Sequence, residues 1–491
     1  MKVLLQEAIE NLLNNVQDEL GVVHQFIGGK YIAGEKKGDV IFQYDGQPVF
    51  TFYKSSIQDV EEAISLAEQA LPSMKKLTLF ERAEILSKTA DILQEHIDSI
   101  AKIIVYETSK TLKDAKGEMT RAISTFRFSA EATKNLHGET LPLDAMSGVG
   151  KRLSFIIHEP IGVVGAITGF NFPILLAAHK LGPAFGAGNT VVLKPSPGTP
   201  ISSIVLAWVL QQAGLPMGAL SVVNGDVEVG EAIVKDPRIA VISFTGSSLI
   251  GRKISQQAEY KKVLLELGSN AATVIDSVEN LEEVAEKLVM GGFGANGQSC
   301  ISVQRIIVNK QLSKELTELL KNKVSLLKVG NPFAEETNVS ALFTKDANQR
   351  IQEWIEEALN DGANLEVGGK IENQIFLPTL LSKVSPEMRV FKEEIFGPVI
   401  LVTTYESFNE AIELVNDSRY GLQVGVYTTN LPNALKAIDE IKAGSVHINE
   451  ISNFRPDHMP YGGYKESGIG KEGPQSVLEE LTNKKVVSFK L

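Results

Sequence analysis

Between residues 160 and 270 the sequence repeats one pattern, in which a short apolar run is followed by a helical stretch or by a turn. The runs are rich in β-branched residues, and the turns contain glycine, proline or asparagine. Short apolar strands that alternate with helices are typical of a parallel sheet with crossover helices. The sequence therefore predicts an α/β fold, with strands at residues 163–167, 191–193, 220–223, 240–244 and 263–265.

The same pattern returns in the C-terminal half and predicts a second α/β domain. Its expected strands are 305–308, 399–403, 425–427 and 444–448, and its expected helices are 312–324, 348–359 and 408–415. Residues 56–135 have the spacing of amphipathic helices. A chain of 491 residues exceeds the size at which one core stops growing, so two or three domains are expected.

Two further segments have the composition of strands but no partner nearby in the sequence. They are residues 152–157 and the C-terminal tail 484–491. Strands without partners leave open edges, and pairing with another subunit is one way to close them. A homo-oligomer, either a homodimer or a homotetramer, is therefore expected.

Charge and composition exclude several classes of partner. A formal net charge of −12 disfavours nucleic acid and anionic membranes. No apolar run approaches the roughly 20 residues of a membrane span. The N-terminal stretch places Leu5, Ile9, Leu12 and Leu13 at helical spacing and lacks the continuous apolar core of a signal peptide. The single cysteine suits a reducing compartment, so a cytoplasmic enzyme acting on a small molecule is expected.

The only cysteine, Cys300, ends the glycine-rich stretch 294–300, which apolar segments flank. A thiol placed after such a polar loop is a candidate nucleophile, because the thiolate reacts readily. The alternative is a thiol that packs as a small apolar residue.

Two segments are candidates for binding a nucleotide. Residues 244–251 follow an expected strand and open a helix, so the backbone and Ser247 could hold a phosphate at the helix N-terminus. Lys194 ends another expected strand, at the sheet edge where ligands bind in such folds. The alternatives are a structural glycine turn and a solvated lysine.

Two more segments are candidates for acid–base and oxyanion chemistry. Glu266 lies in an apolar run, where the pKa of a carboxyl rises and suits a general base. Asn171 lies between Phe170 and Phe172 and is a candidate oxyanion donor. The alternatives are a charge at the exposed end of a strand and a turn residue before proline.

Seven motifs occur in one order over nearly the whole chain: FNFP, KPSPGTP, FTGS, LELG, GQSC, EEIFGPV and PYGGYKESGIG. Together they resemble the aldehyde dehydrogenase superfamily. The resemblance implies that Cys300 is the nucleophile, that Glu266 activates the water that hydrolyses the thioester, and that Asn171 and the Cys300 amide form the oxyanion hole. It implies an NAD or NADP cofactor and no metal, with the cofactor held by Lys194, Ser196, Gly246, Ser247, Glu394 and Phe396. A cysteine-dependent esterase or thioesterase-like hydrolase and a non-catalytic relative are the alternatives.

The resemblance also implies a division of the chain. A Rossmann-like dinucleotide-binding domain would comprise residues 1–137 and 159–267, and the catalytic domain residues 268–446. Residues 138–158 and 480–491 would form a small β oligomerisation element. Residues 447–479 would return along the substrate entrance.

Substrate and cofactor preference are implied less directly. Many NAD-preferring relatives carry a glutamate where this chain has Pro197, so NADP is not excluded. The region around residues 454–460 resembles the branch of lactaldehyde dehydrogenases and non-phosphorylating glyceraldehyde-3-phosphate dehydrogenase, in which arginines bind the phosphate. Arg121 and Arg455 are candidates for such contacts, and Arg455 would contribute less if it lies at the mouth of the tunnel, where solvent screens its charge. With Phe172 and Ser299 as further substrate residues, a short hydroxylated or anionic aldehyde is expected.

Overall fold

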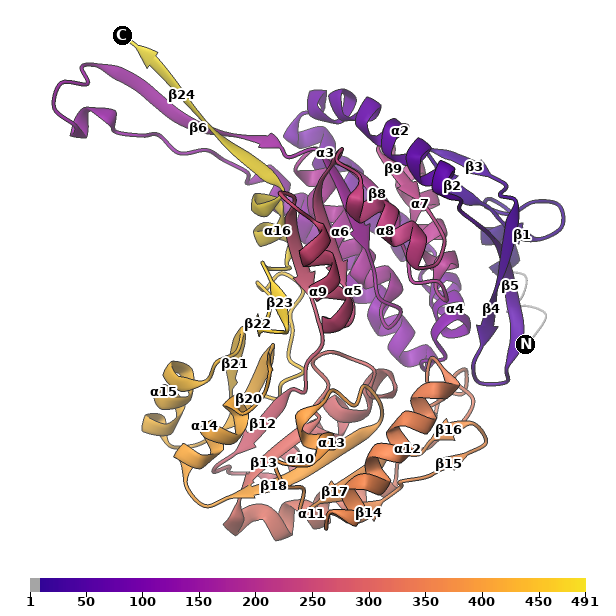
Figure 1. Cartoon of the computed structure of the whole chain (residues 1–491), viewed down its shortest axis with the longest axis vertical. Coiled ribbons are helices and arrows are strands. Elements are labelled where there is room, and N and C mark those ends of the chain that lie inside the picture. Colours follow the sequence, from indigo (N-terminus) through magenta and orange to yellow (C-terminus); the bar gives the residue numbers. More distant parts are fainter. Residues whose placement is uncertain (1–8) are drawn as a thin grey trace.

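The computed structural model of this protein describes residues 9–491, so Leu5 of the expected N-terminal helix lies outside the described part. Two α/β bodies are stacked on each other, and a two-stranded ribbon projects from the first (Figure 1). Each body is built on its own sheet, as the repeated strand pattern predicts.

The sheet of the first body has eight strands in the order β23-β11-β10-β7-β8-β9-β2-β3. The five central strands are parallel, whereas β23 and β2 run antiparallel to their neighbours. The chain runs from β7 to β8 and β9 on one side and places β10 and β11 on the other, so the order reverses between β7 and β10. Ligands bind at such a reversal, beyond the carboxyl ends of the strands. The strands are β2 (Gln25–Ile27), β3 (Lys30–Ile32), β7 (Val163–Ile167), β8 (Thr190–Lys194), β9 (Leu220–Val222), β10 (Ile239–Thr245), β11 (Lys262–Glu266) and β23 (Gly468–Ile469).

Helices cover both faces of this sheet. Val191 packs with the helices of one face and its neighbour Val192 with those of the other, because successive strand side chains point in opposite directions. The first face carries α3 (Leu79–Glu95), α4 (Ile97–Thr108), α5 (Leu112–Lys134), α6 (Pro173–Gly186), α7 (Pro200–Gln212) and α16 (Pro474–Glu480). The second carries α2 (Ile57–Lys76), α8 (Val227–Lys235) and α9 (Ser248–Gln257).

The second body contains a seven-stranded sheet in the order β14-β17-β18-β13-β12-β20-β21. Only β14 runs antiparallel to its neighbour. Its strands are β12 (Ala272–Ile275), β13 (Arg305–Asn309), β14 (Asn364–Val367), β17 (Thr379–Ser382), β18 (Val399–Tyr405), β20 (Gln423–Tyr427) and β21 (Ser445–Ile448). Its helices are α10 (Leu281–Phe293), α11 (Lys310–Ser325), α12 (Lys345–Asn360), α13 (Arg389–Lys392), α14 (Phe408–Asn416) and α15 (Leu431–Glu440).

Smaller elements complete the structure. An N-terminal sheet has the order β1-β5-β4, and two strand pairs join β15 with β16 and β19 with β22. No helix within residues 9–491 is both long enough and apolar enough to cross a membrane. These elements are β1 (Val22–Val23), β4 (Lys36–Phe42), β5 (Gln47–Lys54), β15 (Ile371–Glu372), β16 (Ile375–Phe376), β19 (Tyr420–Gly421), β22 (Tyr464–Lys465) and the short 3₁₀ segments η1 (Leu143–Ala145) and η2 (Gly294–Gly297).

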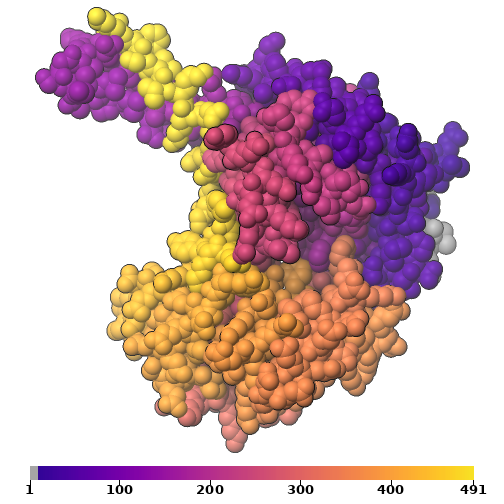
Figure 2. Space-filling view, in the orientation of Figure 1, coloured from indigo at the N-terminus to yellow at the C-terminus, as the bar shows by residue number. Residues whose placement is uncertain are grey.

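The expectation that the two isolated strands lack a partner within the chain is wrong. β6 (Arg152–Pro160) and β24 (Thr482–Lys490) pair with each other, antiparallel over nine residues. They form the ribbon that stands clear of the body in Figure 2. The other edge of β6 bonds to its own chain, since Leu141 N donates to Ser154 O at 2.9 Å and Ile156 N to Glu139 O at 2.8 Å. In the ribbon, the outer edge of β24 has no strand partner among the described residues.

Candidate active site

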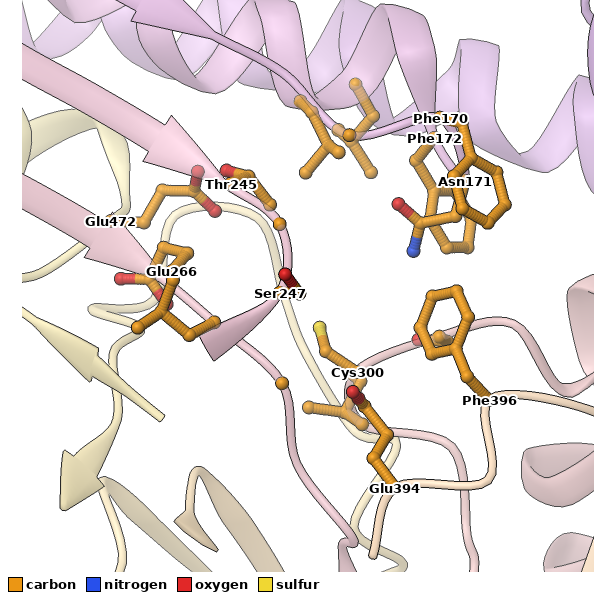
Figure 3. Close-up of a pocket in the computed structure, with 18 of the residues that line it drawn as sticks. Phe170, Asn171, Phe172, Thr245, Ser247, Glu266, Cys300, Glu394, Phe396 and Glu472 are labelled. Atoms are coloured by element: carbon orange, nitrogen blue, oxygen red, sulfur yellow. The ribbon is translucent and has the colours of Figure 1, made fainter. Parts of the chain in front are cut away.

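Two adjoining cavities open where the central strands of the first sheet end. One encloses about 380 Å³ and contains Cys300; the other encloses about 310 Å³ and contains Lys194. They share Phe170 and Gly246, from the loops that follow β7 and β10. The fold therefore places both cavities at the reversal of strand order, and the second body supplies the loop that bears the cysteine (Figure 3).

The loop before the cysteine is held in one conformation. Ala295 and Asn296 have φ angles of 50° and 59°, in the left-handed region. The amide of Asn296 donates to Ser109 O and Ala341 O. Gly297 has a φ of 70°, and a Cβ there would lie 2.2 Å from Gly397 O, so only glycine fits. The glycine-rich sequence thus serves to present Cys300 to the cavity.

Among residues 9–491, one side chain makes a hydrogen bond to the thiol of Cys300. Its Sγ lies 2.9 Å from the hydroxyl oxygen of Tyr461. Burial raises the pKa of the thiol to about 11, although the hydrogen bond to Tyr461 and the charge of Arg455 oppose that rise. Cys300 is partly exposed, lines this cavity and also packs against the apolar cluster of Ile301, Leu422 and Tyr461.

Asn171 lies in the loop between β7 and α6, facing the cysteine loop (Figure 3). Its side-chain nitrogen donates to Gln298 O at 3.0 Å, which uses one of its two hydrogens. The neighbouring Phe170 ring stacks on Phe343, with ring centres 3.8 Å apart. The structure therefore brings Asn171 and Cys300 to the same cavity, and one amide hydrogen stays available there.

A buried ion pair that the sequence patterns did not single out supports Asn171. Lys110 Nζ lies 2.7 Å from the carboxylate of Glu118, and the two side chains are 3% and 0% exposed. The same ammonium donates to Asn171 O and lies 3.9 Å from the centre of the Phe172 ring. Glu118 also accepts hydrogen bonds from the amide of Ile174, at 2.8 Å, in the first turn of α6. The pair ties α5 to the Asn171 loop.

Glu266 ends β11 and lines the same cavity, with a relative exposure of 7%. Burial, followed by the charge of Glu472, raises the pKa of Glu266 well above its usual range. One carboxyl oxygen of Glu266 has no hydrogen-bond partner in the described residues. A carboxylate whose pKa is raised accepts a proton more readily, as a general base requires.

The side chain of Arg455 does not lie at a solvent-exposed mouth. Its side chain is 7% exposed, and its guanidinium binds Glu472 at 2.5 Å. The guanidinium carbon also lies 3.6 Å from the centre of the Tyr461 ring. Residues 455–472 fold back over the cavity between the two bodies, and a sequence pattern carries no information about that burial.

Glu472 and Lys180 are further ionisable residues that the motifs did not identify. Lys180 Nζ lies 3.8 Å from Glu472, and both side chains are buried. Burial favours the neutral form of Glu472, but His179 when protonated, Arg455 and Lys180 lower its pKa to about 2. For Lys180 the available signal was its position inside the apolar run 174–187, the same kind of signal that pointed to Glu266, whereas Glu472 lies in a polar, glycine-rich segment without such a signal.

Arg121 projects from α5 and lines the cavity, with 32% of its side chain exposed. Its Nη2 lies 2.8 Å from Asp457, and its Nε also donates to that carboxylate. Its Nη1 makes no hydrogen bond within residues 9–491. Phe172 and Ser299 line the same cavity.

The second cavity contains Lys194, Ser196 and Gly246, as the motifs predict for a cofactor. Lys194 is 6% exposed, and within the described part of the chain its ammonium makes one hydrogen bond, to Pro195 O at 3.2 Å. A buried ammonium with two unused hydrogens fits a polar ligand such as a ribose hydroxyl. Burial lowers the pKa of Lys194 to about 8.

The other three expected cofactor residues lie on the cysteine side. Ser247, Glu394 and Phe396 line the Cys300 cavity. Ser247 also caps α9, and Glu394 accepts a hydrogen bond from Ser269 N at 2.9 Å. A cofactor bound from Lys194 to Phe396 would span both cavities, as a dinucleotide does.

Comparisons with known proteins agree with this geometry. The family described as the aldehyde dehydrogenase family matches residues 31–487. The 3-sulfolactaldehyde dehydrogenase of Priestia aryabhattai is 40% identical over 467 residues, which cover 95% of this chain and 98% of that protein.

Two solved structures are similar throughout. Aldehyde dehydrogenase 21 from Physcomitrella patens, in complex with the reaction product succinate, has a TM-score of 0.94 at 35% identity and covers 96% of this chain and 98% of its own. The glyceraldehyde-3-phosphate dehydrogenase GapN from Methanocaldococcus jannaschii, complexed with NADP, has a TM-score of 0.89 at 35% identity and covers 93% and 99%. The chain belongs to the aldehyde dehydrogenase family.

Proposed function

We propose that this protein oxidises a short anionic aldehyde to the carboxylic acid with NAD or NADP, through a covalent bond to Cys300. The observation that supports the proposal most is the convergence of Cys300, Glu266 and Asn171 on one cavity that adjoins the Lys194 cavity. These residues come from distant parts of the chain, and each offers a different function: a nucleophile, a base and an amide donor.

The proposed reaction assigns one step to each group. The Cys300 thiolate attacks the aldehyde carbon, a carbon–sulfur bond forms, and the carbonyl electron pair moves to oxygen. Asn171 and the Cys300 amide donate hydrogen bonds to that oxygen. The nicotinamide, when bound, would supply an acceptor for a hydride. As that hydride leaves the carbon, the electron pair on oxygen re-forms the carbonyl, and Cys300 then carries a thioester. Glu266 then takes a proton from the water that attacks the thioester. The carbon–sulfur bond breaks, its electron pair returns to Cys300, and the acid is released.

Cofactor preference depends on the cavity around Lys194. Pro197 lies there in place of a carboxylate that would repel a 2′-phosphate, which supports use of NADP as well as NAD. Asp226 lines the same cavity, but Lys54 lies 2.9 Å from its carboxylate and compensates its charge. The GapN structure in complex with NADP and the 35% identity to it agree with this proposal.

The substrate proposal depends on cations in the cysteine cavity. Arg121 has a free Nη1, and its other donors are fixed by Asp457, so the guanidinium is held in place to bind an anion. Arg455 adds a second buried cation, which Glu472 largely compensates. The similarity to a 3-sulfolactaldehyde dehydrogenase supports a hydroxylated aldehyde that carries a sulfonate.

The test is an aldehyde panel assayed with NAD and with NADP. We expect 3-sulfolactaldehyde to be oxidised more efficiently than lactaldehyde, and Cys300→Ser to abolish both reactions. Arg121→Ala should raise KM for the sulfonated aldehyde by about tenfold, because a charge-assisted hydrogen bond is lost, and change lactaldehyde little. Equal losses on both aldehydes would make Arg121 structural. Ester hydrolysis without nucleotide, and no aldehyde oxidation, would favour a hydrolase.

We also propose a homodimer or homotetramer. Along the ribbon, β24 has an open edge and exposed apolar side chains: Val486 is 60% exposed and Phe489 is 53% exposed. An exposed strand edge of this kind pairs readily with another chain. This compact assembly would act in the reducing cytoplasm, where Cys300 stays a free thiol.

A further inference from the structure

Tyr461 contacts the reacting atom, although the proposed reaction gives it no role. Its hydroxyl oxygen lies 2.9 Å from Cys300 Sγ, and its side chain is 1% exposed. The backbone around it is anchored, since Tyr461 N donates to Glu472 O at 2.9 Å. Among the residues described, no other side chain makes a hydrogen bond to the sulfur.

The ring of Tyr461 is fixed from its other side. The Arg455 guanidinium carbon lies 3.6 Å from the ring centre, over its face, and Glu472 holds that guanidinium at 2.5 Å. A cation over a phenol ring withdraws electron density from the hydroxyl and makes it a better hydrogen-bond donor. The ring can therefore present its O–H bond to the sulfur without reorganising.

We propose that Tyr461 is a catalytic residue whose hydroxyl donates a hydrogen bond to the Cys300 thiolate, before attack on the aldehyde and again when sulfur leaves the thioester. This inference depends on the proposed function, because it concerns the same thiol. When Cys300 loses its proton to water, the charge on sulfur gains a donor. When water attacks the thioester and the carbon–sulfur bond breaks, the electron pair returns to sulfur and the same donor stabilises it.

The charged groups around the sulfur explain why a donor is needed there. Burial raises the pKa of Cys300, and the carboxyl groups of Glu394 and Glu266 raise it further, whereas Tyr461 and Arg455 lower it. Burial also raises the pKa of Tyr461 well above its usual range, so the hydroxyl keeps its proton and acts only as a donor to a thiolate.

The test measures the rate at which the Cys300 thiol is alkylated. Because the chain contains a single cysteine, every cysteine adduct reports on this thiol. The holoprotein is treated with iodoacetamide between pH 7 and 9, and one adduct per chain is followed by intact mass. We expect Tyr461→Phe to be alkylated about tenfold more slowly at each pH, because a hydrogen bond to a charged group is lost and the thiolate fraction falls. Tyr464→Phe is the control, since Tyr464 is 52% exposed in the same segment, and its rate should not change.

The sign of the effect separates this role from packing. Removal of the hydroxyl opens space beside the sulfur, so a purely structural tyrosine predicts an equal or faster rate for Tyr461→Phe, and that result overturns the proposal. If the variant does not fold, 3-fluorotyrosine placed at position 461 gives the opposite test: a stronger donor should speed alkylation, and an unchanged rate overturns the proposal. Alkylation needs no aldehyde, so a Cys300→Ser enzyme that still oxidised aldehydes would refute the proposed function separately.

Discussion

The buried ion pair of Lys110 and Glu118 offers a sharp test of how the oxyanion site is supported. Replacement by Lys110→Met keeps the length of the side chain but removes its charge. The Glu118 carboxylate, which is 0% exposed, then loses the cation that lies 2.7 Å from it in the parent protein. The replacement also removes the donor to the carbonyl of Asn171 and the cation over the Phe172 ring.

The size of the effect follows from what remains. Loss of one partner of a buried ion pair costs about 3–5 kcal/mol. Glu118 keeps hydrogen bonds from Ile174 N at 2.8 Å and Leu175 N at 3.2 Å, at the N-terminus of α6, which favours its charge. We therefore expect Lys110→Met to lose stability at the low end of this range, about 3 kcal/mol. Because Asn171 loses its anchor, we expect acylation to slow by about tenfold to hundredfold, less than the 10²–10³ for loss of an oxyanion donor itself.

The assay is a double-mutant cycle in Lys110→Met, Glu118→Gln and the double variant. Stability is measured by urea unfolding, and acylation by the burst of reduced cofactor. The double variant should recover about 2 kcal/mol relative to Lys110→Met, because the uncompensated charge is gone. It should not recover the burst rate, because the anchor of Asn171 is still missing. A Lys110→Met protein as stable and as fast as the parent would refute this reasoning.

Three further predictions concern the base, the cofactor and the assembly. Glu266→Gln should give a burst of reduced cofactor and then a slow steady state, since an amide cannot take a proton from water; absence of the burst would place Glu266 in an earlier step. In the parent, deacylation should quicken as pH rises through the raised pKa of Glu266, well above 4.5, and this dependence should vanish in Glu266→Gln. Pro197→Glu should lower kcat/KM for NADP about tenfold more than for NAD, from a like-charge clash of about 1.4 kcal/mol; an unchanged ratio would place selectivity elsewhere. Light scattering at micromolar concentration should show a dimer or tetramer, and a 53.4 kDa particle would contradict the proposed pairing of β24.

Both α/β bodies could be predicted from the sequence, because strands and crossover helices produce residue patterns within short segments. The expected runs 163–167, 191–193 and 240–244 each lie in a strand of the first sheet. Cys300 and Glu266 could be singled out for the same reason, since a lone thiol after a glycine turn and a carboxyl in an apolar run are visible in a few neighbouring residues.

Tertiary structure alone decided what surrounds those residues. Tyr461 is 161 positions from Cys300, and Lys110 is 61 positions from Asn171, so no local spacing relates them. The burial of Arg455 and the pairing of β6 with β24 depend likewise on how residues 447–491 return across both bodies. Contacts of this kind form only when distant segments pack together. The periodicity of apolar residues within a segment indicates which face of that segment is buried. It does not indicate which distant segment packs against that face.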